Sequence, residues 1–564
     1  MRRIFTFYLC ICACFLSATI LHAQGQFSGD LQLNAKFFDT DTLRAAANTP
    51  FYDWAKFGSD AWFSLNYSNY ENHLEMGVRF DSFNNTDLFS GGVLQNNGSG
   101  IGAFYIRKRI DNLKVSAGYI YDQWGSGFVF RSFENRGLGL DNPLVGISAQ
   151  YDLGKHITLK AIAGKLKNMR NFVSHTRENA FIYTYSPFIK GAQIEANLAS
   201  KSGKLSLLPG AAVVGRTIDN ETMQLIVDEI NNQALETRFV PKYNSFAWTI
   251  YNNLIFGKWS IYAEYAGKSE DVQRDNTVIR NADGVVESVK QDLIDDKGHV
   301  LFGSIAYAQK GLGITLSARK INHFAFRTSP LEFLNDGLIN FLPPLTRQNS
   351  LRLPARYQAN AQPIDETALQ ADVVFSPKKG IVFTFNVSDV RNKAEKLFNE
   401  LYVDVEIKQK DKSWKLLTGF NMVDYNRQVY EQKGDFVNTL TPFAEFTYKF
   451  TKKKSLRTEL QYMMTERNRK LFGKDEPAEK QDLGDWLYGL VEYNIAPHYS
   501  FSASDMYNLS DKLHYYDFSV FYTNKANRFS LGYAKQVQGI ICTGGVCRFE
   551  PAFSGVKFSM STTF

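Results

Sequence analysis

The chain of 564 residues is rich in aromatic side chains, with 45 Phe and 29 Tyr, and its formal net charge of +7 is small for its length. Such a nearly balanced charge gives no reason to expect a nucleic-acid partner. The mean hydropathy is −0.28, and beyond the N-terminus no segment has the run of about 18 apolar residues that a spanning helix needs. The composition therefore excludes a multi-helical membrane protein and leaves a soluble all-β protein or a transmembrane β-barrel.

The N-terminus has the features of an export signal. Arg2 and Arg3 precede an apolar run that ends in LHA at residues 21–23, and the polar Gln24 follows. A small residue between an apolar run and a polar residue is typical of a signal-peptidase site. We therefore expect residues 1–23 to be a signal peptide, and a retained anchor helix is the alternative.

One strand pattern recurs along the chain, because apolar and polar residues alternate over about ten positions, the length of a tilted strand that crosses a bilayer. In residues 73–81, HLEMGVRFD, the apolar Met76, Val78 and Phe80 share one face and charged residues occupy the other. The pattern returns in residues 258–267, 441–450 and 455–466. Followed through the chain, it predicts about 24 strands, within a range of about 22 to 26.

The connections between the predicted strands alternate in length. YSNYEN, RIDN and FGK are short, and the longest connection covers residues 321–365. Short turns at one end and long loops at the other are typical of outer-membrane barrels. The predicted fold class is therefore all-β: a transmembrane, antiparallel, up-and-down β-barrel with short periplasmic turns and long extracellular loops. It forms a single domain over residues 24–564.

Residues 119–142 combine several glycines with charges of alternating sign. The charged side chains are Arg131, Glu134, Arg136 and Asp141. One interpretation is a charged constriction of the lumen that selects solutes. The other, which the glycine-rich path favours, is a buried network of ion pairs that anchors an inward loop.

The long connection over residues 321–365 contains a predicted apolar helix. Ser329 can cap it, Pro330 suits its first turn, and two prolines at residues 343–344 end it. The residues Leu331, Leu334, Leu338, Ile339 and Phe341 form a broad apolar stripe. We predict a loop that fills the lumen as a lid or constriction, and the alternative is a helix on the outer rim or against a partner.

Two cysteines remain after the signal peptide is removed, Cys542 and Cys547 in ICTGGVC. An isolated pair in an exported protein most simply forms a disulfide, because the compartment is oxidising. We expect this disulfide to rigidify the tip of the last long loop.

The last ten residues, GVKFSMSTTF, alternate with period two and end on an aromatic residue. Phe558, Met560 and Phe564 have the pattern of the C-terminal strand of outer-membrane barrels, and this resemblance implies recognition by the barrel assembly machinery.

Three further stretches carry a resemblance to a family. Residues 119–142, FLPPLTRQNSLRLPARY at 341–357 and ICTGGVCR at 541–548 resemble features of a large outer-membrane β-barrel family of Bacteroidota whose function is unassigned. The resemblance implies integral insertion in the outer membrane of a Gram-negative bacterium, contact with outer-membrane lipid and, as further partners, other outer-membrane proteins. It implies no activity.

An enzyme would need a constellation of catalytic residues. The histidines of the mature chain lie outside motifs such as G-x-S-x-G and H-E-x-x-H. His299 follows Asp295 and Asp296, and His514 lies between Asp511 and Asp517. Polar residues at strand ends explain both groups more simply than catalysis does, so we expect no catalytic residue, no cofactor and no metal.

Three functional hypotheses follow. The first is a non-enzymatic barrel with a polar lumen that acts as a loop-gated conduit for hydrophilic solutes. The second is a structural or accessory subunit of a larger outer-membrane complex for assembly, secretion or uptake, with an occluded lumen. The third is a membrane-embedded hydrolase.

Overall fold

The structure is a computed structural model. It describes residues 25–42, 56–86, 96–138, 140–175, 180–281, 286–332, 337–393, 395–431, 436–466, 484–537, 539–543, 546–550 and 552–564. The predicted signal peptide lies outside these residues.

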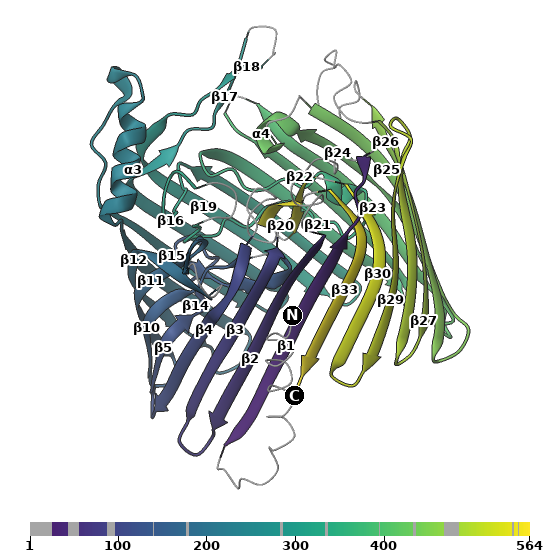
Figure 1. Cartoon of the computed structure of the whole chain (residues 1–564), viewed down its shortest axis with the longest axis horizontal. Coiled ribbons are helices and arrows are strands. Elements are labelled where there is room, and N and C mark those ends of the chain that lie inside the picture. The colour runs from purple at the N-terminus through teal and green to yellow at the C-terminus, as the bar shows by residue number, and fades with distance from the viewer. Residues whose placement is uncertain are drawn as a thin grey trace.

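A closed antiparallel barrel of 24 strands forms the body of the protein (Figure 1). β1 (Gln26–Phe38) pairs with the last strand, β33 (Phe553–Thr563), from Asp30 opposite Thr563 to Phe38 opposite Gly555. This pairing closes the sheet, so the barrel has no free edge. The predicted fold class and strand number are confirmed.

The other strands follow in chain order. The first half of the wall consists of β2 (Phe57–Asn69), β3 (Leu74–Thr86), β4 (Asn96–Ile110), β5 (Leu113–Ile120), β10 (Leu144–Leu153), β11 (Ile157–His175), β12 (Ala180–Ala196), β14 (Leu205–Thr217), β15 (Asn244–Phe256), β16 (Trp259–Arg274) and β19 (Leu293–Gln309). The second half consists of β20 (Leu312–Asn322), β21 (Asp365–Lys378), β22 (Ile381–Arg391), β23 (Lys396–Lys408), β24 (Trp414–Asn426), β25 (Phe436–Lys449), β26 (Lys454–Glu466), β27 (Trp486–Ile495), β28 (Tyr499–Asn508), β29 (Leu513–Asn524) and β30 (Asn527–Gln536).

Short elements occupy the connections. They are β6 (Asp122–Gln123), β7 (Arg131–Ser132), β8 (Glu134–Asn135), β9 (Leu140–Asp141), β13 (Leu198–Ala199), β17 (Val278–Arg280), β18 (Val286–Val289), β31 (Gly539–Thr543), β32 (Val546–Glu550), α3 (Asn220–Asn231), α4 (Arg427–Glu431), η2 (Arg136–Leu138), η3 (Leu235–Thr237) and η4 (Pro354–Arg356). Helix α3 and the β17–β18 hairpin lie at the long-loop end of the barrel (Figure 1). In the part of the chain that the structure describes, no helix has the length and hydropathy needed to cross a membrane.

The wall separates an apolar outer face from a mixed inner face, as period-two strands require. On β15, Phe246, Trp248 and Ile250 are exposed, whereas the intervening Ala247 and Thr249 are buried inside the barrel. An apolar outer surface of this kind suits contact with lipid. The alternation predicted from the sequence therefore also distinguishes the lipid-facing residues from the lumen-facing ones.

Aromatic side chains gather on the outer face near the short turns. Trp259 and Tyr307 have ring centroids 4.7 Å apart, and Tyr499 and Tyr522 have centroids 5.1 Å apart. Aromatic residues at this level form the interfacial girdle of outer-membrane barrels. Phe564 joins the same end of the barrel, where its backbone N–H donates to Gly29 O at 3.1 Å.

The helix predicted in the connection between β20 and β21 is wrong for the residues described there. Residues 329–332 and 337–344 form turns and coil with an isolated bridge between Arg327 and Leu338. The capping chemistry is present, because Ser329 Oγ accepts from Leu331 N at 3.2 Å. However, Gly337 adopts a φ of 59°, which is left-handed and turns the chain back.

A charge on the outer face tests the assignment of faces. Ile305 is exposed toward lipid on β19, and its neighbour Ser304 faces the lumen, where it shares a hydrogen bond with Ser317 at 2.9 Å. We expect Ile305→Lys to lower the free energy of unfolding in lipid vesicles by about 2–4 kcal/mol. Ser304→Lys is the matched control and should cost about 1 kcal/mol; equal losses in urea titrations would contradict the assignment.

Candidate functional site

Two connections at the long-loop end turn into the barrel. The inner loop, residues 121–143, links β5 to β10, and the crossing segment, residues 323–364, links β20 to β21. They pair with each other through their backbones, since Arg131 N donates to Ile339 O and Phe341 N to Gly127 O, both at 2.8 Å. The two connections thus form one body inside the lumen.

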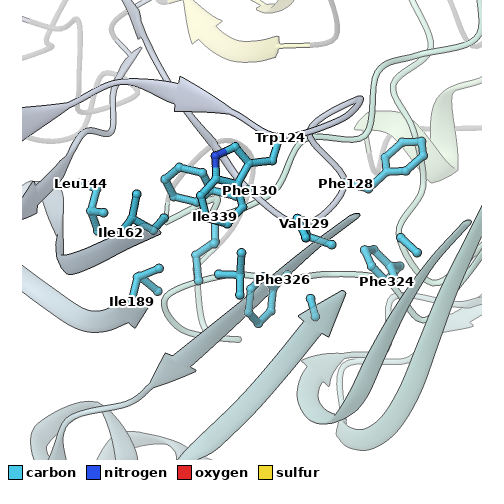
Figure 2. Packing of buried hydrophobic residues seen from close by; sticks show 14 of the residues in the cluster. Trp124, Phe128, Val129, Phe130, Leu144, Ile162, Ile189, Phe324, Phe326 and Ile339 are labelled. Carbon is cyan, nitrogen blue, oxygen red and sulfur yellow. The ribbon is translucent and has the colours of Figure 1, made fainter. Parts of the chain in front are cut away.

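A first apolar cluster holds this body against the first half of the wall (Figure 2). Trp124, Phe128 and Phe130 of the inner loop pack with Phe324, Phe326 and Ile339 of the crossing segment, as Figure 2 shows. The wall contributes the lumen-facing Leu144, Ile162, Leu166, Ile189, Ala212, Val214, Ala247, Ala266, Val300 and Ile321. The cluster has the character of a protein core, so no water-filled channel runs along this side of the described lumen.

A second apolar cluster holds the rest of the crossing segment against the second half of the wall. Leu345, Leu353 and Tyr357 pack there on wall residues that include Phe398 and Trp486. The remaining buried wall members are Ala368, Val390, Leu397, Val423, Tyr425, Val437, Met463, Met506 and Tyr515. The crossing segment therefore reaches from one half of the barrel wall to the other.

Three buried cations of the wall bind backbone carbonyls of the crossing segment, and we call Arg216, Lys268 and Arg319 the wall cations. Lys268 Nζ donates to Ala325 O at 2.7 Å, Arg216 donates to the carbonyl of Arg327, and Arg319 donates to that of Pro343. Asp271 pairs with both Arg216 and Lys268, and Glu366 pairs with Arg319. Each cation has a carboxylate partner in the wall, with Asp271 shared by Arg216 and Lys268, so none depends on the crossing segment alone for a counter-charge.

Ion pairs attach the inner loop to the strands β3 and β11, through what we call the charge network. Arg79 lies at its centre, 2.6 Å from both Asp81 and Asp141 and 2.7 Å from Glu134. Lys167 lies 2.7 Å from Asp141. Arg136 completes the network through Glu134 at 2.6 Å and Asp30 at 2.9 Å.

Of the four residues singled out in the sequence, Glu134, Arg136 and Asp141 belong to this network and Arg131 does not. The Arg131 guanidinium lies between two rings, 3.9 Å from the centroid of Phe133 and 3.8 Å from that of Phe341. The sequence analysis missed Asp30, Arg79 and Lys167 as partners. The sequence did offer a signal for Arg79 and Asp81, because two charged residues occupy neighbouring lumen-facing positions of one predicted strand.

The electrostatics of the inner loop follow from these contacts. Burial alone would raise the pKa of Asp141, but Lys167 and Arg79 outweigh it and hold this pKa well below its usual range. The intact network therefore favours the ionised form of Asp141. A persistent charge of this kind fixes the loop to the wall.

The remaining predicted site residues lie elsewhere. Cys542 and Cys547 face each other in the register of the β31–β32 hairpin, but their side chains lie outside the described part, so the disulfide stays a prediction. Phe558 and Met560 face outward on β33, opposite Ala35 and Leu33 of β1.

The histidine constellation differs from the one expected for a hydrolase. His514 Nδ1 lies 2.6 Å from Asp505 rather than contacting Asp511 or Asp517. His514 lies on the same face of β29 as the exposed Phe518, and Asp505 lies on the same face of β28 as the exposed Phe501. This pair therefore faces outward near the barrel rim. Among the described residues, no three His, Cys, Asp or Glu side chains gather as metal ligands would.

Removal of the central cation tests the charge network. Arg79→Ala removes a cation from the buried carboxylates of Asp81 and Asp141 and from the partly buried Glu134, so we expect the free energy of unfolding to fall by about 3–5 kcal/mol. Arg107→Ala is the matched control, because its partner Glu75 is 3.6 Å away and both side chains are partly exposed; it should cost less than about 1 kcal/mol. Similar losses for both variants, measured by urea unfolding in vesicles, would refute a buried network.

The pH dependence of stability tests Asp141. A carboxyl with a folded pKa below its unfolded value, about 3.9, stabilises the protein above that value and loses this contribution as the pH falls. We expect Asp141→Asn to be less stable than the natural protein at pH 7 and the difference to narrow below about pH 4. A difference that is constant from pH 7 to pH 3 would show that Asp141 is not held ionised by its neighbours.

Comparisons with solved structures show only distant similarity. The siderophore receptor PirA from Acinetobacter baumannii has 7% sequence identity and a TM-score of 0.41, with 96% of this chain and 80% of that chain covered. The P pilus usher PapC translocation pore has 9% identity and a TM-score of 0.39, with 95% and 99% covered. OpdK from Pseudomonas aeruginosa has 10% identity and a TM-score of 0.34, with 96% and 98% covered. These values carry no argument about function, and the fold rests on the strand pairing described above.

No curated protein matches this chain. One family model does, over residues 1–564, and its description is a family of unknown function. The chain therefore belongs to the DUF6029 family.

Proposed function

We propose that this protein is a loop-gated conduit for hydrophilic solutes in the outer membrane, closed by the crossing segment in the conformation described above. The observation that carries the proposal is that the crossing segment packs against both halves of the wall. A barrel obstructed in this way conducts only when the segment moves.

The inner face toward the short turns supports a hydrated passage. Lys557 and Asp517 lie 3.0 Å apart on this face and are each more than a third exposed. Lys415 and Arg457 both lie 2.9 Å from Glu445 in the same region. Ionised, accessible side chains of this kind line the lumens of water-filled barrels.

The way the segment is held supports a gate. It is a connection between two neighbouring strands, so its displacement breaks none of the hydrogen bonds that close the barrel. The wall cations keep Asp271 and Glu366 as partners when the segment leaves. Each wall cation therefore retains a carboxylate partner in the open state.

The same proposal includes biogenesis. Residues 1–23 direct export, and the barrel assembly machinery recognises the strand that carries Phe558, Met560 and Phe564. The outer faces of the strands then contact outer-membrane lipid.

Single-channel recording in planar bilayers tests the gate. We expect the intact protein to be closed most of the time, and a variant with residues 325–360 replaced by a short Gly-Ser linker to give large ohmic steps. The matched control replaces residues 278–289, the β17–β18 hairpin that lies beyond the barrel wall, and should behave like the intact protein. Large steady steps from the intact protein, or silence from the first variant, would contradict the proposal.

A second candidate is a structural or accessory subunit of a larger complex. It is favoured by apolar side chains exposed in the connection that carries α3: Leu225 at 54%, Leu235 at 77% and Val240 at 86%. If a partner covers them, Leu235→Ser with Val240→Ser should release that partner after gentle detergent extraction, while the barrel stays folded.

A further inference from the structure

Two lysines lie on the outer face of β11 and β12, on the left of the barrel in Figure 1. On β11, Lys165 is exposed, whereas the flanking Gly164 and Leu166 are buried. On β12, Lys190 is exposed beside the buried Ile189. Because successive side chains of a strand point to opposite faces, both lysines point away from the lumen. We call Lys165 and Lys190 the lysine pair.

The two lysines are neighbours on this surface. In the register of β11 and β12, Lys165 lies opposite Phe188, and Lys190 lies opposite Ala163. The lysines are therefore diagonal neighbours on one face, with their Cβ atoms about 7 Å apart. Lysine stems are long and flexible, so one anion can contact both ammonium groups.

The lysine pair lies within the apolar surface rather than beyond it. Val145 of β10 and Phe188 of β12 are opposite Lys165 on its two sides, and Phe188 is exposed. Ile147, also exposed, is in line with Lys190 across β11. The pair is thus surrounded by side chains that suit lipid.

The height of the pair places it in the extracellular half of the wall. β11 begins at Ile157, at a short turn. A strand tilted by about 40° rises about 20 Å between Ile157 and Lys165. The apolar band of an outer-membrane barrel is about 25 Å tall, so the lysine pair faces the outer leaflet.

Neither lysine has an acidic partner within 4.0 Å in the part of the chain that the structure describes. Other outward-facing charges do have such partners. Arg391 lies 2.5 Å from Asp389, and His514 lies 2.6 Å from Asp505. A charge on the lipid-facing surface costs free energy, and the cost grows toward the midplane. Ionisable groups at membrane depth therefore point to a ligand that supplies the counter-charge.

We propose that the lysine pair binds a phosphomonoester group of the glycolipid in the outer leaflet, as found in lipid A. This inference goes beyond the conduit proposed above and does not depend on whether the lumen opens.

Charge selects the phosphomonoester. Its charge at pH 7 is about −1.5 to −2, which two ammonium groups balance. The phosphodiester of most phospholipids carries a single negative charge, so it leaves the pair incompletely neutralised. Position selects the same ligand, because the phosphorylated glycolipid of Gram-negative bacteria lies in the outer leaflet. The exposed apolar side chains nearer the short turns, such as Leu159 and Ile194, then contact its acyl chains.

Binding of diphosphoryl lipid A to the purified protein in detergent, measured by native mass spectrometry, tests the site. We expect Lys165→Gln with Lys190→Gln to weaken binding at least tenfold, and Lys165→Arg with Lys190→Arg to retain it, because both charges remain. Lys378→Gln with Lys379→Gln removes the same charge from an exposed short turn; it is the matched control and should bind like the natural protein. Equal binding by the first variant and the natural protein would overturn the proposal.

Two further lipids test the ligand class. We expect phosphatidylglycerol, and lipid A without its phosphates, to bind at least tenfold more weakly than diphosphoryl lipid A. Equally tight binding of phosphatidylglycerol would show that the pair accepts any anionic lipid. Equally tight binding of the dephosphorylated glycolipid would show that acyl chains alone are recognised. Either result would overturn the proposal.

Stability in vesicles gives a second readout, in which the sign of the effect changes. In phosphatidylcholine vesicles the two lysines lack a counter-charge, so we expect Lys165→Gln with Lys190→Gln to unfold at a higher urea concentration than the natural protein. Addition of diphosphoryl lipid A should reverse this order. An order that lipid A leaves unchanged would contradict the proposal.

Discussion

Burial of apolar side chains inside the barrel is the interaction on which the rest of the structure depends. A closed barrel of 24 strands encloses more space than its own inward side chains can fill. The inner loop and the crossing segment supply the missing apolar surface, and the lumen-facing side of the wall supplies small or branched partners such as Ala247 and Val300. The same strands present large apolar side chains to lipid. Alternate residues of one strand therefore face two apolar environments, the lipid outside and the packed cluster inside the lumen.

The polar contacts inside the lumen follow from that burial. A chain segment inside a barrel carries backbone carbonyls that need donors, and Lys268 and the two arginines among the wall cations provide them. The charge network holds the inner loop to the wall through ion pairs between side chains. Along residues 345–358 of the crossing segment, two guanidinium groups lie over rings of the wall: Arg347 is 3.6 Å from the centroid of Tyr402, and Arg356 is 4.0 Å from that of Trp486. Closure of the lumen thus depends on how the buried polar groups of the wall pair with the crossing segment and the inner loop.

The sequence was a good guide to the wall and a poorer guide to the lumen. Period-two alternation is local, so it placed strands such as residues 73–81 and the C-terminal strand correctly. The partners of Glu134 and Asp141 are distant in sequence, Arg79 on β3 and Lys167 on β11, and one sequence does not reveal which inward charges meet. The helix predicted after Ser329 failed because Ile339 packs with the inner loop and the wall, Leu331 packs instead on the cluster around α3, and Gly337 reverses the chain. The 3.6-residue spacing there reflected burial on several sides rather than one helical face.

A reversible bridge between the crossing segment and the wall tests the central claim most directly. Asn349 of the crossing segment and Glu400 of the wall are in hydrogen-bond contact, so Asn349→Cys with Glu400→Cys, in a background with Cys542→Ser and Cys547→Ser, can be joined by a short bifunctional thiol reagent. The account predicts that single-channel openings stop when the bridge forms and return when a reductant cleaves it. Openings that continue unchanged in the bridged protein would show that the crossing segment does not control the lumen.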